Sequence, residues 1–235
     1  VLDRLPSNYD TVGISANVFA SSSFGFDQIF DEFVDAPRNG FFVRGHDAVG
    51  NLMSGNTILS IIKQSLQHDH PIQSLGNIFS AALHHLTLGR PIPGLVDDGA
   101  AAILREVQRR LNSTNQPQFI FVNLMEAHSP MSHHRHLDNS LHSVPTSWNS
   151  NELDYWDVVL NSSEYTQEKE WYRDLYRANI DYLDRVIADF LADMPDDTTA
   201  IITSDHGENL GYLDEDNLWE HKSSLSESLI DVPLM

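Results

Sequence analysis

Residues 198–235 read TTAIITSDHGENLGYLDEDNLWEHKSSLSESLIDVPLM, and this stretch decides how the rest of the chain is interpreted. It opens with the apolar run 200–202, which predicts a buried strand. The run leads into Ser-Asp-His-Gly-Glu at 204–208. A strand that ends in an acid, an imidazole and a glycine is typical of an open α/β sheet, which binds ligands at the carboxyl ends of its strands. The stretch therefore predicts an α/β fold with a site at Asp205 and His206.

The overall composition limits the class of protein. The chain has 235 residues, 41% of them hydrophobic, which suits a single globular domain spanning 1–235. Its 34 acids and 14 bases give a formal net charge of -20. This balance excludes duplex nucleic acid as a partner, because phosphates need basic side chains. We expect no membrane segment, since no run is long enough, and the absence of a signal-like start favours the cytoplasm.

The scarcity of basic residues also indicates the salt concentration at which the protein works. The lysines are Lys63, Lys169 and Lys222. An acidic chain suits high salt, because screening removes the repulsion between like charges. We therefore expect a halophilic source, and dilution into low-salt buffer should unfold the protein, as followed by circular dichroism. A chain that keeps its full stability without added salt would contradict this expectation.

The regular elements alternate along the chain. Segments 11–16 (TVGISA), 118–124 (QFIFVNL) and 198–203 are predicted strands, and another begins near Val232. Apolar residues three and four positions apart predict helices over 51–70, 74–88, 97–111 and 166–192. In the last helix the predicted apolar stripe includes Tyr172, Tyr176, Ile180 and Leu183. This order predicts a three-layer fold, a mostly parallel sheet with helices on both faces, incomplete at both ends.

Polar side chains follow a second predicted strand. Segment 118–124 leads into Met-Glu-Ala-His-Ser-Pro at 125–130. Because the carboxyl ends of parallel strands share one edge, His128 can meet the groups that follow residue 203. The His-His-Arg-His run at 133–136 is predicted as a solvated loop, because adjacent side chains point in different directions and do not share a metal ion.

Four segments of the chain resemble motifs of the sulfatase family, within the alkaline-phosphatase-like superfamily. They are Thr-Ser-Asp-His-Gly-Glu at 203–208, His-Lys-x-Ser-Leu at 221–225, Val-Pro-Leu at 232–234 and Met-x-x-His-x-Pro at 125–130. The resemblance implies an alkaline-phosphatase-like fold. It also implies metal-dependent hydrolysis of a sulfate ester on a small molecule or a glycan.

The resemblance assigns a role to each candidate residue. Asp205 and His206 would bind a divalent metal ion, most simply Ca²⁺, with Zn²⁺ or Mn²⁺ as alternatives, and upstream aspartates would complete the site. Lys222 would neutralise the non-bridging sulfate oxygens, and His128 and His221 would transfer protons at the leaving oxygen or the nucleophile.

The nucleophile of the family is a formylglycine made from the first residue of a Cys/Ser-x-Pro-x-Arg motif. The chain contains no cysteine and no such motif. We expect an internal part of a longer protein, with the formylglycine upstream, and no activity from residues 1–235 alone.

Two other functions stay open. The same superfamily contains phosphoryl hydrolases and transferases that use two zinc or manganese ions, and Asp205 with His206 suits them too. A non-catalytic sulfatase-like module is the third possibility, since Ser-Ala-Asn-Val stands at 15–18, where many members carry a lysine and a histidine. The upstream nucleophile and the number of metal ions would separate these functions. The oligomeric state is left open.

Overall fold

The computed structural model describes residues 2–48, 51, 55–87, 90, 92–213, 216–222 and 224–235. Its strands are β1 (Asp10–Ser15), β2 (Glu32–Asp35) and β3 (Gln118–Asn123). Its α-helices are α2 (Ile58–Gln67), α3 (Pro71–Thr87), α4 (Ala100–Leu111), α5 (Tyr155–Leu160), α6 (Thr166–Ala192) and α7 (Glu227–Ile230). Short 3-10 helices lie at Leu2–Arg4, Ser22–Phe24, Phe26–Gln28 and Ser150–Glu152.

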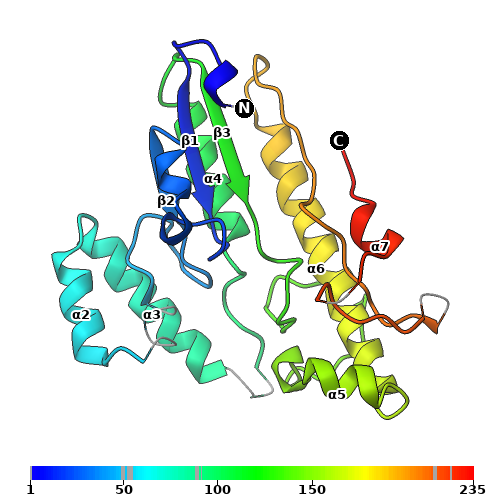
Figure 1. The fold of residues 1–235 in the computed structure, drawn as a ribbon. Coiled ribbons are helices and arrows are strands. Elements are labelled where there is room, and N and C mark those ends of the chain that lie inside the picture. The colour runs from blue at the N-terminus through cyan, green and yellow to red at the C-terminus, as the bar shows by residue number, and fades with distance from the viewer. Residues whose placement is uncertain are drawn as a thin grey trace.

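The three strands form a parallel sheet in the order β2-β1-β3, with helices around it (Figure 1). At the carboxyl end of β1, Ser15 pairs with Asp35 of β2 and with Asn123 of β3. The ends of all three strands therefore lie at one edge, where such sheets place their ligand sites. The α/β class and the parallel sheet predicted from the sequence are confirmed.

One face of the sheet packs against α4. Val12 and Ile14 of β1 are buried and join Ile103 and Val107 of α4 in one apolar cluster, which Phe190 of α6 extends. Side chains alternate along a strand, so these positions point to the same side. This packing fixes the sheet against both α4 and α6.

The opposite face is covered by aromatic rings. A Cβ atom on Gly13 would lie 2.3 Å from the ring of Phe33, so β1 needs glycine there for the ring to approach. Phe30 stacks on Phe121 of β3 with ring centroids 5.9 Å apart. Strand β2, which contains Phe33, was not predicted.

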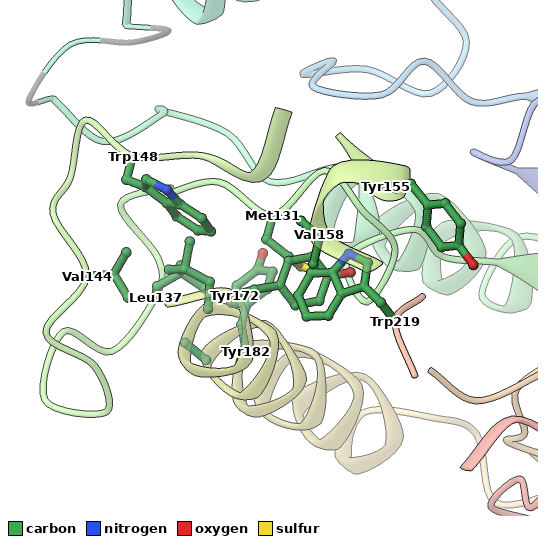
Figure 2. Packing of buried hydrophobic residues seen from close by; sticks show 11 residues of the cluster. Met131, Leu137, Val144, Trp148, Tyr155, Val158, Tyr172, Tyr182 and Trp219 are labelled. Carbon is green, nitrogen blue, oxygen red and sulfur yellow. The ribbon is translucent and has the colours of Figure 1, made fainter. Parts of the chain in front are cut away.

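A second apolar core lies between α5, α6 and the loops around them (Figure 2). Tyr172 and Leu175 of α6 are buried in it, together with Val158 of α5. Trp219 packs on Tyr172 with ring centroids 4.7 Å apart. This contact anchors the segment before His221 to α6.

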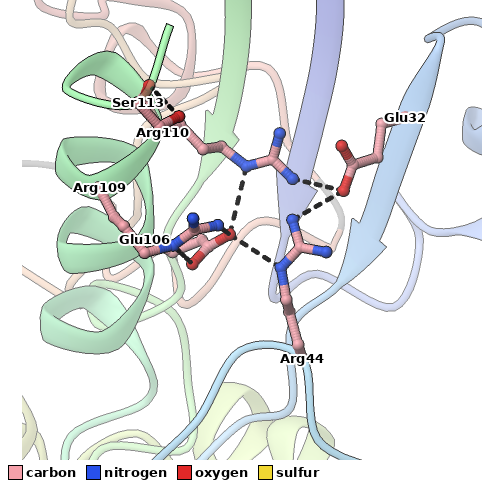
Figure 3. Close-up of polar contacts among 6 residues, drawn as sticks. All are labelled: Glu32, Arg44, Glu106, Arg109, Arg110 and Ser113. Carbon is pink, nitrogen blue, oxygen red and sulfur yellow. Dashed lines mark hydrogen bonds and ion pairs between the residues drawn. The ribbon is translucent and has the colours of Figure 1, made fainter. Parts of the chain in front are cut away.

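Ion pairs join β2, α4 and the loop between β2 and α2 (Figure 3). Arg44 donates to Glu32 at 2.8 Å and to Glu106 at 2.9 Å. Arg110 contacts the same two carboxylates, and Arg109 donates to Glu106 at 2.7 Å. We call these five residues the arginine–glutamate network.

The ends of α3 and α4 lie within three residues of the predicted bounds, whereas α2 begins at Ile58, seven residues after the predicted start at 51. The bounds of α6 are those predicted, whereas α5 was not predicted. Residues 52–54 and 88 of the predicted helices lie outside the described residues. The buried face of α6 differs in part from the predicted stripe, since Tyr182 is buried and Ile180 is 41% exposed. No described helix has the length and apolar character needed to cross a membrane.

The predicted buried strand over 198–203 is wrong. Ile201 is 75% exposed, and Thr203 forms an isolated antiparallel bridge with Leu234. Ile202 and Met235 exchange backbone hydrogen bonds of 2.9 and 3.0 Å. The predicted strand near Val232 belongs to this same isolated pair, and Figure 1 draws α6 between the pair and the sheet. A short apolar run becomes a sheet strand only where a strand of the sheet takes its hydrogen bonds, and this run pairs with residues 234–235 instead.

Candidate active site

A buried asparagine folds the C-terminal segment back on itself. The side-chain amide of Asn209, 1% exposed, donates to the carbonyl of Glu220 at 2.5 Å and to Ser224 Oγ at 2.9 Å. Its side-chain oxygen accepts from the hydroxyl of Ser226. These bonds bring residue 221 back beside residue 208, and the Trp219 contact with α6 holds the segment in place.

Gly207 allows a close backbone contact in the same segment. A Cβ atom there would lie 2.0 Å from the carbonyl oxygen of Ser228 in α7. The Gly207 N–H donates to the carbonyl of Leu229 at 2.9 Å. The close partner is the chain's own α7.

Three predicted site residues lie together. The imidazole centroids of His206 and His221 are 4.4 Å apart, and those of His128 and His221 are 5.6 Å apart. His128 follows β3 at the edge of the sheet, whereas the other two come from the C-terminal segment. We call these three residues the histidine cluster, with His221 at its centre.

Glu208 lies behind the central imidazole. Its Oε2 atom is 3.1 Å from Nδ1 of His221, and its side chain is 5% exposed. Burial, reinforced by the charge of Glu220, raises the pKa of Glu208 to about 7. Burial and the neighbouring His206 lower the pKa of His221. With Nδ1 bonded to the carboxylate, the Nε2 atom of His221 is the one left for proton transfer.

Asp205 and His206 form only part of a metal site. Asp205 is exposed, with its Oδ1 atom 3.9 Å from Nε2 of His206. An oxygen and a nitrogen at this separation fit as neighbouring ligands of one divalent ion. Within the described residues, no group of three or more histidines, cysteines or acids is placed to hold a metal ion. Calcium takes six to eight oxygen ligands, so this pair would supply a minority of them.

Lys222 has its own partners. Its Nζ atom lies 2.7 Å from a carboxylate oxygen of Glu220 and 4.7 Å from the ring centroid of Tyr155. The structure therefore holds this ammonium group beside the histidine cluster and does not place it in the cluster. The positive charge of Lys222 lowers the pKa of Glu208 and so opposes the effect of burial.

The family model for sulfatases matches residues 7–235. The chain belongs to the sulfatase family. Comparison with curated proteins finds no match, and comparison with solved structures finds none. The match spans the sheet, α6 and the histidine cluster, so the predicted family is confirmed, and with it a hydrolase family with an alkaline-phosphatase-like α/β fold.

The sulfatase-family resemblance did not reveal Glu208 as a partner of His221. Glu208 belongs to the Ser-Asp-His-Gly-Glu segment at 204–208, but the resemblance gave this residue no role. The only available signal was an acid close to two predicted ligands. Glu208 pairs with His221, 13 positions away, because the side-chain hydrogen bonds of Asn209 fold the segment back on itself. Those bonds leave no local pattern in the sequence.

A second polar cluster of this sulfatase-family chain surrounds the start of α4. Asp97 Oδ2 accepts from the hydroxyl of Tyr182 at 2.6 Å, and Glu126 Oε1 accepts from the backbone N–H of Ala100 at 2.6 Å. Burial, with the charge of Asp97 next, raises the pKa of Glu126 to about 8. Glu126 is therefore mostly neutral at pH 7, which suits a carboxyl group in this interior.

The histidines at 133–134 belong to this interior as well. The prediction of a solvated loop for 133–136 is wrong at these positions, since His133 and His134 are each 8% exposed. His134 packs edge-on against Tyr182, with ring centroids 4.8 Å apart. A run of adjacent histidines looks polar in sequence, but the imidazole is flat enough to pack against an aromatic ring.

Proposed function

We propose that the protein hydrolyses the sulfate ester of a small molecule or glycan. The observation that carries the proposal is the position of His221, which contacts His206 and His128 and is backed by Glu208. The carboxyl group of Glu208 and the imidazoles of His221 and His128 lie near the edge of a parallel sheet and are suited to proton transfer. Membership of the sulfatase family supports sulfate esters as the substrate class.

His221 has the central role in this proposal. We assign the proton to Nδ1, so that it donates to Glu208 and the contact holds the ring in one orientation. The Nε2 atom then takes a proton from the nucleophile or returns one to a departing oxygen. His128 lies beside the same ring and is the candidate for the second proton transfer.

We also propose that Asp205 and His206 bind a divalent metal ion. Oxygen ligands favour Ca²⁺, while the imidazole nitrogen also suits Zn²⁺ or Mn²⁺. When bound, such an ion polarises the oxygens of the ester and lowers the energy of the charge that develops on them. Lys222 would neutralise the remaining sulfate oxygens after its ammonium group leaves Glu220.

The test uses a chromogenic ester. The protein isolated from its source should hydrolyse 4-nitrophenyl sulfate, lose that activity with a chelator and regain it with Ca²⁺. Residues 1–235 alone should show no turnover, because they lack the Cys/Ser-x-Pro-x-Arg motif.

The same assay separates the alternatives. Faster turnover of a phosphate monoester or diester than of the sulfate would overturn the proposal in favour of phosphoryl chemistry. Binding of the metal ion without turnover of either ester would overturn it in favour of a non-catalytic module.

A further inference from the structure

The side of α3 that faces the preceding loop is polar, while Ile78 and Ala81 pack against Ile61 of α2. The Asn77 side chain accepts from the backbone N–H of Phe42 at 3.0 Å and donates to the carbonyl of Phe42 at 2.9 Å. Ser74 Oγ accepts from the N–H of His46 at 3.0 Å, and Ser80 donates to the carbonyl of Asn39. This face is therefore used to satisfy the backbone of the preceding loop.

The opposite face of α3 is apolar and exposed. Ile72 is 82% exposed and Phe79 is 60% exposed. Usually a surface helix turns its apolar side inward and its polar side outward. Helix α3 carries a second apolar face that is exposed, which indicates that this outer face is built for contact with another surface. The residues of this face, which we call the α3 seam, are Ile72, Leu75, Phe79, Ala82 and Leu86.

The spacing of the α3 seam fits another helix. Its members follow one another by three and four positions, the repeat by which two helices interlock side chains. Phe42 widens the apolar surface, since its ring lies where a Cβ atom on Gly76 would be 2.6 Å away. Exposed apolar residues of the neighbouring α2 are Ile58, Leu59 and Leu66.

Charge favours a second copy of the chain as the occupant. The formal net charge of -20 opposes contact between copies over most surfaces. Helix α3 contains no aspartate, glutamate, lysine or arginine, so two copies can meet there without repulsion. A lipid surface fits less well, because helices that lie on membranes carry lysine and arginine on their polar side.

We propose that the protein forms a two-fold symmetric dimer through antiparallel packing of α3 against α3 of a second copy. Phe79 stands at the midpoint of Pro71–Thr87, so the symmetry axis brings it against its own copy. Ile72 then meets Leu86. The helix is about 25 Å long, and a stable interface buries about 800 Å² on each partner. The exposed residues of α2 and Phe42 therefore take part too.

Cysteine cross-linking tests this geometry directly. The chain has no cysteine, so Phe79→Cys introduces a single thiol. On mild oxidation this variant should form a disulfide-linked dimer, because paired Cα atoms must lie within about 7 Å. Ile72→Cys alone should not cross-link, whereas an equal mixture of the Ile72→Cys and Leu86→Cys variants should. Leu160→Cys on α5, 77% exposed and outside the seam, is the matched control.

Light scattering after size exclusion gives the second readout. The wild-type protein should have twice its chain mass at micromolar concentration, and Phe79→Lys should shift it to the monomer with an unchanged circular dichroism spectrum. Leu160→Lys should remain dimeric. A monomeric wild-type protein, or Phe79→Cys cross-linking no faster than Leu160→Cys, would overturn the proposal, as would binding of a monomer to lipid vesicles through this seam. None of these readouts depends on sulfatase activity.

Discussion

Replacing His221 by alanine should lower kcat/KM of the full protein for an aryl sulfate by about 100- to 10,000-fold, the usual contribution of a positioned acid–base group. The expectation rests on the place of this ring between His206 and His128, with Glu208 against Nδ1. Alanine removes the proton-transfer atom and leaves the buried carboxyl of Glu208 without its partner. The measurement is steady-state turnover of 4-nitrophenyl sulfate at saturating metal ion.

A graded variant separates orientation from proton transfer. Glu208→Gln keeps a hydrogen-bonding group near Nδ1 but removes the charge, so we expect about a tenfold loss in kcat with little change in KM. His68→Ala, outside the histidine cluster, should retain wild-type kinetics. If the His221→Ala variant kept more than a third of the wild-type kcat/KM, His221 would have no part in proton transfer.

Glu106→Gln should reduce the free energy of unfolding by about 3 kcal/mol at pH 7. Glu106 is only 11% exposed and receives hydrogen bonds from Arg44, Arg109 and Arg110. Burial by itself would raise the pKa of this carboxyl, but the bonds from Arg109 and Arg44 lower it to about 2. The neutral amide of glutamine leaves three guanidinium groups without that charge.

The pH dependence of this effect has a definite sign. A carboxyl whose pKa is lower in the folded than in the unfolded protein stabilises the fold above the unfolded value of 4.5. That contribution falls as the pH drops from 4.5 toward about 2. Urea unfolding of wild type and variant at constant salt should show a gap at pH 7 that shrinks steadily below pH 4.5.

A control variant tests whether the loss of stability is specific to the arginine–glutamate network. Glu164→Gln changes an exposed acid outside the arginine–glutamate network and should shift the free energy of unfolding by less than about 0.5 kcal/mol. Equal losses from the Glu106→Gln and Glu164→Gln variants, or a gap that does not depend on pH, would show that the network does not stabilise the fold.

The elements that the sequence predicts well are those whose signal is local. Helix α6 repeats apolar residues over 27 positions, so both of its ends were predicted. The face it buries was predicted only in part: Tyr172 belongs to the predicted stripe and is buried, whereas Tyr182 lies outside that stripe and is buried against His134. Periodicity gives a helix, whereas its orientation depends on distant partners.

The failures have the same physical origin. Strand β2 is four residues long with an acid at each end, so no apolar alternation marks it. Its hydrogen bonds come from β1, about 20 positions earlier. The run 200–202 shows the opposite error: its composition is that of a strand, yet its backbone partner is Met235, Ile201 is exposed, and its two neighbours are only partly buried.

The candidate site residues also divide into those with a local sequence signal and those without one. His128, Asp205 and His206 follow apolar runs, and this position together with the family resemblance predicted them as site residues. Glu208 needed knowledge that Asn209 folds the chain back to Glu220, a contact over 11 positions with no periodic signal. The burial of His133 and His134 was hidden for the same reason, since it arises from packing near α6.

The bonds of Asn209 have a mechanical consequence for the site. Because they tie residue 209 to residues 220, 224 and 226, we expect Glu208 and His221 to move together. His128 lies on a different segment, the loop that leaves the sheet after β3. A displacement of one segment relative to the other would change the separation of His128 and His221 and leave the contact between Glu208 and His221 intact.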